Sequence, residues 1–167
     1  LSTQAAYRLY KPVASMKPLD FAISHYSASD ADKRLLAMAQ YYKAMLLYDA
    51  GSVKDGVVFL KNAEFIAKNV PDAELHHKIF ESLELVNEES GELQAAMQYA
   101  RKSLAVSADA RNALWQVHAC NNLAVLHSKT GNADSASVYI RRCMLMLRYI
   151  PQAERKVVLN NIGAYFM

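Results

Sequence analysis

The chain has 167 residues, of which 53% are apolar, with only five Gly and four Pro, a composition typical of an ordered helical protein and not of a disordered one. Its formal net charge of +3 is too small to make nucleic acid the expected partner, and two cysteines cannot build a disulfide framework. No apolar run is long enough to span a membrane and no secretory signal sequence is recognisable, so we expect no membrane insertion by this region.

The predicted elements are all helices. Residues 1–30 contain two short apolar-periodic segments, AAYRLY and PLDFAISHY, which predict a degenerate helical pair that caps the rest of the chain. Long helices are expected at about 31–49, 72–90, 110–130 and 151–167, and shorter ones at about 53–69, 92–107 and 132–148. Ser29 and Ser107 are candidate N-caps of two of the long helices. Because no segment has the alternating pattern of a strand, the predicted fold class is all-α.

A forty-residue period organises these helices. Gly51, Gly91 and Gly131 each end a long apolar-periodic run, where glycine adopts the left-handed conformation at no steric cost. Small residues recur five and twelve positions after each glycine, as Gly56, Ala96 and Ala136 and as Ala63, Ser103 and Cys143. Such repetition predicts stacked supersecondary units, which we place at about 31–70, 71–109, 110–149 and, as a partial unit, 150–167.

This pattern resembles the tetratricopeptide repeat, in which a Gly or Ala of the first helix meets two small residues of the second helix. The third unit carries the likeness best, through Leu123, Ala124, Gly131, Ala136 and Cys143. The second unit departs from it, because Glu84 occupies the usual Gly/Ala position. The resemblance covers about 31–167 and implies an α-α superhelix, a right-handed solenoid of antiparallel helix pairs. Long repeats with tyrosine-rich first helices, such as AMAQYYKAMLLYDAG, resemble the arrays of Bacteroides-type transcriptional regulators.

One stretch, CNNLAVLH at 120–127, combines a thiol, an imidazole and two carboxamides, and His118 precedes it. These are side chains of a cysteine hydrolase or a metal site. The pattern of two Asn, an apolar residue and a small residue recurs as Asn160-Asn161-Ile162-Gly163, in the next unit. A packing pattern is copied in each repeat, whereas a catalytic site is not. We therefore favour buried thiols for Cys120 and Cys143, with a disulfide between them left open, and a core position for His127.

No other constellation indicates chemistry. His76 and His77 point about 100° apart on a helix, so we expect a helix-surface pair rather than a metal site. No phosphate-binding loop, zinc signature or nucleophile elbow is recognisable. We accordingly expect no enzyme, no catalytic residue, no metal and no cofactor.

Charge is unevenly distributed along the chain. Seven acidic residues lie between Asp72 and Glu92, with Lys78 as the one basic residue there, whereas Arg141 to Lys156 is a basic segment. Such runs are usually solvated helix faces, and the alternative interpretation is that they steer a polar partner.

The resemblance implies that the first helices of successive units line a concave groove that holds a protein or peptide. The predicted groove contacts are Met38, Tyr41, Met45, Tyr48, Glu81, Leu85, Glu88, His118, Asn121, Val125, Ser128, Asn160 and Ala164. Tyr and Met suit such a role because they are large and adaptable.

The predicted function is therefore a non-enzymatic, protein- or peptide-binding repeat module. The resemblance makes it the sensory or scaffolding part of a longer bacterial regulator, in the cytoplasm or the periplasm, without direct nucleic-acid binding by this region. The alternative is a structural spacer or self-association element of a larger protein, for which a membrane anchor outside this region is left open. Because the chain begins with Leu1 and ends within an amphipathic pattern, we expect a fragment whose last helix, with Leu159, Ile162 and Phe166, would support homo-association.

Overall fold

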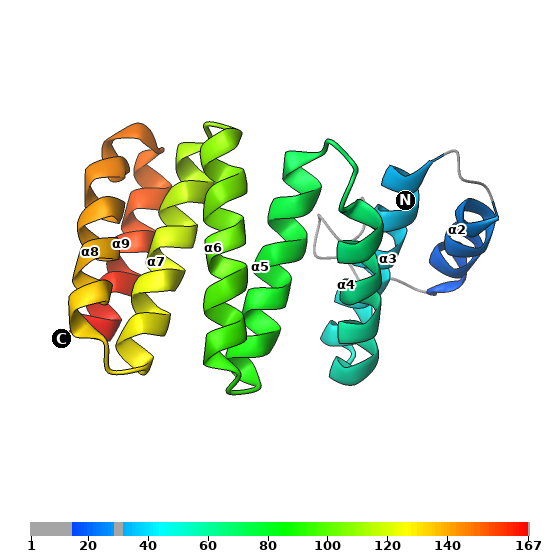
Figure 1. Cartoon of the computed structure of the whole chain (residues 1–167), viewed down its shortest axis with the longest axis horizontal. Helices are drawn as coiled ribbons and strands as arrows, with labels where there is room; N and C mark the ends of the chain where they lie inside the picture. Colours follow the sequence, from blue (N-terminus) through cyan, green and yellow to red (C-terminus); the bar gives the residue numbers. More distant parts are fainter. Residues whose placement is uncertain (1–14, 29–31, 167) are drawn as a thin grey trace. The chain divides into compact units, whose positions relative to one another are not determined.

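The computed structural model describes residues 15–28 and 32–166, apart from the side chains of residues 161–162 and 164–166. These ranges contain helices and turns but no strand, which confirms the all-α class. In chain order the helices are α2 (Lys17–Ser27), α3 (Lys33–Asp49), α4 (Val53–Ala67), α5 (Ala73–Glu89), α6 (Leu93–Asp109), α7 (Ala113–Lys129), α8 (Ala133–Met146), the 3-10 helix η1 (Leu147–Tyr149) and α9 (Gln152–Phe166) (Figure 1).

The predicted helices correspond closely to the observed ones. The largest difference at a helix start is at α7, which begins at Ala113 and not at 110. Ser107 is not the N-cap of α7, because α6 continues to Asp109 and the buried Ser107 hydroxyl donates to the Leu104 carbonyl (2.8 Å). Asn112 caps α7 instead, accepting a hydrogen bond from the Trp115 amide (3.2 Å).

The N-terminal cap region lies largely outside the described residues. Of the predicted helical pair at 1–30, only α2 is described, and Ser29 falls outside the described ranges. The N-cap of α3 is Asp32, whose carboxylate accepts a hydrogen bond from the Leu35 amide (3.0 Å). At the other end, the last turn of the segment predicted at 132–148 tightens into η1.

Four of the turns between helices share one hydrogen-bond pattern. The residue in the left-handed conformation donates its amide to the carbonyl three residues back, and the next residue donates to the carbonyl five residues back. Gly51, Gly91 and Gly131 hold this position with φ of 81°, 79° and 74°, as their spacing predicts. Arg111 holds it between α6 and α7 with φ of 52°, at a place where a residue with a Cβ is strained.

The chain divides into two compact units, residues 1–79 and 80–167, and α5 runs through the boundary. In the first unit, α3 packs against α2 and α4. The crossing of α3 and α4 is close, since a Cβ added at Gly56 would lie 3.0 Å from the Ala44 carbonyl oxygen. Ala44 and Ala63 are also fully buried there, which confirms the predicted meeting of small residues.

In the second unit, α7 is central and packs against α6, α8 and α9 (Figure 1). Its core is one cluster built from Ala96, Met97, Ala100, Leu104, Val117, Ala119, Cys120, Leu123, Leu126, Cys143, Leu147, Ile150 and Val158. Ala124 and Ala136, the small residues predicted at the α7–α8 crossing, are buried as well. Of the thirteen residues of this cluster, α7 supplies five and α6 supplies four, so these two helices supply most of the core of the second unit.

Candidate partner-binding surfaces

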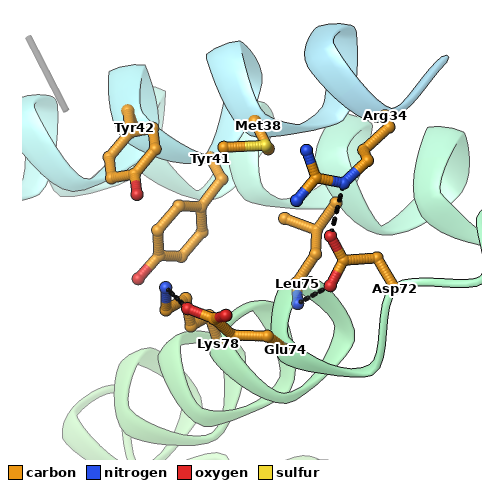
Figure 2. Close-up of a pocket in the computed structure, with 8 residues that line it drawn as sticks. All are labelled: Arg34, Met38, Tyr41, Tyr42, Asp72, Glu74, Leu75 and Lys78. Carbon is orange, nitrogen blue, oxygen red and sulfur yellow. Dashed lines mark hydrogen bonds and ion pairs between the residues drawn. The ribbon is translucent and has the colours of Figure 1, made fainter. Parts of the chain in front are cut away.

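A cleft in the first unit lies between α3 and the beginning of α5 (Figure 2). Its lining residues are Arg34, Met38, Tyr41 and Tyr42 from α3, and Asp72, Glu74, Leu75 and Lys78 from the first turns of α5 and the residue before it. The residues of α3 recur at helical spacing and so lie on one face of the helix. Two of the predicted groove residues, Met38 and Tyr41, are thus brought together.

Asp72 holds one side of the cleft in place. Its carboxylate accepts a hydrogen bond from the Leu75 amide (2.9 Å), which caps α5, and forms an ion pair with the Arg34 guanidinium (2.6 Å). Partial burial acts to raise the pKa of Asp72, but the hydrogen bonds from Leu75 and Arg34 outweigh it, and the pKa of Asp72 lies below its ordinary value. One carboxylate thus joins a helix start to the neighbouring helix.

The opposite side of the cleft carries a second ion pair, between Glu74 and Lys78 of α5. Figure 2 shows the Tyr41 ring pointing from α3 toward this pair. The Tyr41 side chain is buried, and its ring meets that of Tyr42 edge to face with 5.3 Å between centroids. Met38 is half-buried and Leu75 is buried, so the cleft has an apolar lining between two paired sets of charges.

The volume of the cleft, about 40 Å³, limits what it can hold. Sites for small molecules and cofactors usually measure roughly 300–1,000 Å³. The cleft is the right size for one short apolar side chain of a partner, and the charged pairs beside it offer hydrogen-bond donors and acceptors to a polypeptide backbone.

The remaining predicted groove residues of α3 lie outside this cleft. Met45 and Tyr48 are both half-buried and continue along the helix toward its C-terminal end.

Two of the three predicted groove residues of α5 in the second unit, Glu81 and Glu88, lie near the buried carboxyl group of Glu84. Glu84 is buried and its Oε2 accepts a hydrogen bond from Asn122 Nδ2 of α7 (2.7 Å). Glu88 is half-buried and pairs with Lys129 of α7 (2.6 Å). Glu81 is half-buried, whereas Leu85 is exposed. Where the other two units have Ala44 and Ala124, this unit therefore has a polar link between α5 and α7.

Burial dominates the titration of these carboxyl groups. It raises the pKa of Glu84 to about 8 despite the opposing hydrogen bond from Asn122, and repulsion from Glu88 and Glu81 acts in the same direction as burial. Burial also raises the pKa of Glu81 to about 7. Glu84 is consequently protonated at neutral pH and can donate a hydrogen bond to Glu88.

The predicted groove residues of α7 differ in accessibility. Asn121 and Val125 are buried, and Asn121 Oδ1 has no hydrogen-bond partner among the described residues. His118 and Ser128 are half-buried. Burial lowers the pKa of His118, although attraction to Glu154 partly offsets this, so the ring is neutral at pH 7. Only half of this predicted set presents accessible side chains.

Two of the predicted groove residues belong to the last helix, α9. Asn160 is exposed on α9, and the side chain of Ala164 lies outside the described residues.

The cysteines of the second unit are buried thiols. Cys120 and Cys143 are fully buried and not bonded to each other, and Cys143 Sγ donates to the Val117 carbonyl (3.7 Å). Burial raises the pKa of Cys120, and burial with repulsion from Cys120 raises the pKa of Cys143 to about 11. His127 is buried too, and its ring stacks on Tyr139 with 5.5 Å between centroids. The packing interpretation of CNNLAVLH is therefore confirmed for these side chains.

The expectation of a helix-surface pair at His76 and His77 is wrong. His77 is buried, and the half-buried His76 places Nε2 2.7 Å from the Ala67 carbonyl oxygen, because the start of α5 lies against the end of α4 within the first unit. Within the described ranges, no group of three His, Cys, Asp or Glu side chains could hold a metal ion.

Several residues of the cleft were not predicted. Arg34 precedes Met38 by one helical turn, so the periodicity of α3 could have indicated it. Asp72, Leu75 and Lys78 belong to a different repeat unit, and nothing in a single sequence shows which face of α3 the start of α5 meets.

No protein-family model matches the chain, and a search of curated proteins finds no match. None of the helices in the described part of the chain is long and apolar enough to cross a membrane.

Proposed function

We propose that the chain is a non-enzymatic, tetratricopeptide-like module that binds a peptide segment of a partner protein, and that the cleft between α3 and α5 holds one of its side chains. The observation that carries this proposal is the cleft itself. It combines an apolar lining from Met38, Tyr41 and Leu75 with two charged pairs, and it is too small for a cofactor-sized ligand.

Binding would use two kinds of contact. An apolar side chain of the peptide enters between Met38 and Leu75, which removes apolar surface from water. The peptide backbone meets the Arg34 guanidinium, which lies beside Met38 and Leu75 at one side of the cleft (Figure 2). Because the rim charges are already paired, the peptide gains hydrogen bonds without a buried, unpaired charge.

The chemistry of the other polar clusters supports binding and not catalysis. A thiol whose pKa is raised by burial is a poor nucleophile at neutral pH, and this applies to both Cys120 and Cys143. The stacked, buried ring of His127 is a packing group. By the resemblance of the repeats, the module would be the sensory or scaffolding part of a longer bacterial regulator.

A peptide-display selection against the full chain tests this function. We expect enriched peptides that share a short apolar residue and bind with micromolar dissociation constants. The Met38→Glu variant should weaken them at least tenfold, because it places a charge in the apolar lining. Met144→Glu is the matched control, since Met144 is exposed on α8 of the second unit. Selection without enrichment, or equal binding by both variants, would overturn the proposal.

A further inference from the structure

The outward face of α8 carries an exposed apolar stripe. Ala136 and Cys143 are the buried residues of this helix, and α8 packs against α7. On the opposite face, Val138 is 53% exposed and Leu145, two turns later, is 69% exposed. Tyr149 of η1 continues the line and is also exposed. Isolated exposed apolar residues are common, but three at helical spacing form a surface that water covers at a free-energy cost.

Three arginines border this stripe. Arg141, Arg142 and Arg148 are exposed, and no ion pair to any of them occurs among the described residues. Between residues 133 and 149 the one acidic residue is Asp134. The Arg148 guanidinium lies 4.7 Å from the centroid of the Tyr149 ring, which joins charge and apolar surface at one end of the stripe.

The same exposed pattern occurs eighty residues earlier, on α4. Val58 and Phe65 occupy the positions of Val138 and Leu145, and Phe65 is 80% exposed. Lys61 and Lys68 occupy the positions of Arg141 and Arg148. Buried residues recur in each repeat because the packing of the helices requires them. Packing gives no reason for exposed apolar residues to recur.

The intervening second helix, α6, shows that the pattern is not a general property of the repeat. At the corresponding positions it has Gln98 and Ala105 in place of the apolar pair, although Arg101 keeps the basic position. The outward face of α6 is thus an ordinary solvated face, and it supplies a natural control for α8.

We infer that the outward face of α8 and η1 is a second interaction surface, and that it binds an acidic protein segment carrying apolar side chains at helical spacing. Arginine matches this partner better than lysine does, because its planar guanidinium pairs with a carboxylate through two parallel hydrogen bonds. The stripe from Val138 to Tyr149 extends about 16 Å, at 1.5 Å per residue, which fits about three turns of a partner helix.

Two other occupants are less suited to this face. A second copy of the chain would offer the acidic α5, but its carboxylates are engaged within their own chain, Glu74 with Lys78, Glu84 with Asn122 and Glu88 with Lys129. An anionic lipid surface would meet Asp134, which lies one turn before Val138 on the same face and would be repelled.

This surface is independent of the cleft in the first unit. Met38→Glu, which alters the cleft, should therefore leave binding to α8 unchanged, and a failure of one proposal would not affect the other.

The test uses the full chain and three probes. One is a labelled helical peptide with Leu at positions i, i+7 and i+11 and Glu on both sides, the second has Lys in place of each Glu, and the third is a phosphatidylcholine–phosphatidylserine vesicle. We expect the acidic peptide to bind with a micromolar dissociation constant that rises with salt concentration. Arg141→Glu should weaken it at least tenfold, and Leu145→Ser severalfold.

Arg101→Glu on α6 is the matched control, because it makes the same charge reversal at the same repeat position without the apolar stripe, and it should leave binding nearly unchanged. The combined variant Arg141→Glu, Arg148→Glu should gain affinity for the lysine peptide. Equal weakening by Arg101→Glu and Arg141→Glu would overturn the proposal. So would vesicle binding without peptide binding, or an acidic peptide that binds no better than the lysine peptide.

Discussion

At the scale of single residues, Glu84 shows how a repeat accommodates a polar group at a packing position. The positions forty residues before and after it hold Ala44 and Ala124, whereas here a buried carboxyl group links α5 to Asn122 of α7. Because burial raises the pKa of Glu84 to about 8, the folded state holds a proton that the unfolded chain loses near pH 4.5. The second unit therefore contains a neutral carboxylic acid at pH 7.

This proton predicts the pH dependence of stability. A group whose pKa is raised in the folded state stabilises it below the unfolded pKa, and the contribution is lost as the pH rises through the folded value near 8. Glu84→Gln keeps the shape and cannot ionise, so relative to wild type it should gain on the order of 4 kcal/mol between pH 5 and pH 9. Urea unfolding at three pH values checks this. Glu89→Gln, at an exposed position of the same helix, is the control, and parallel pH profiles for wild type and Glu84→Gln would contradict the account.

Arg111 supports a second prediction at this scale. It holds the left-handed position that Gly holds in three other turns, at φ of 52°. Arg111→Gly should stabilise the chain by about 0.5–1 kcal/mol, since the relief of strain exceeds the entropy that glycine gives the unfolded state. Gly91→Ala makes the reverse change in an equivalent turn and should destabilise by a similar amount. The urea midpoint measures both, and a lower midpoint for Arg111→Gly would show that its side chain stabilises the turn by another route.

At the scale of elements, the start of α5 lines the cleft and is also linked to α3. Asp72 caps the helix and also pairs with Arg34, so the two roles can be separated by substitution. Asp72→Ala should destabilise by about 1–2 kcal/mol, as for other lost N-caps. Asp72→Asn keeps a capping oxygen and should cost less than about 1 kcal/mol, because the ion pair is partly exposed.

The lowered pKa of Asp72 sets the direction of its pH effect. Its stabilisation is complete above the unfolded pKa near 3.8 and is lost as the pH falls through the lower folded value. Thermal unfolding of wild type and Asp72→Asn should therefore converge at strongly acidic pH. Equal losses for the Ala and Asn variants would show that the ion pair, and not the cap, is the main contribution.

The elements were largely predictable because their ends carry local signals. The three glycines marked helix ends, and the small residues Gly56, Ala63 and Ala136 marked the helix crossings. The predictions of an N-cap at Ser107 and of a surface position for His77 were wrong because both depend on tertiary packing. That packing buries the Ser107 hydroxyl and the His77 imidazole between helices. The cleft was predictable only on its α3 side, since its other side belongs to the next repeat.

At the scale of the whole molecule, charge and apolar surface are distributed differently on first and second helices. The carboxylates of α5 are mostly engaged by partners within the chain, whereas the arginines of α8 are not. The net charge of +3 is therefore unevenly distributed, and the outward face of α8 is both basic and apolar. The first helices supply the cleft, and the outward faces of second helices supply the separate surface proposed for α8.

Mapping a selected peptide onto the full chain by methyl NMR tests the central claim most directly, because it reports where the peptide binds and not only that it binds. We expect the largest shifts on the methyl groups of Met38 and Leu75, with little change at Val138 and Leu145, and we expect Met38→Glu to abolish this pattern. Shifts confined to other residues, or an unchanged pattern in Met38→Glu, would contradict it.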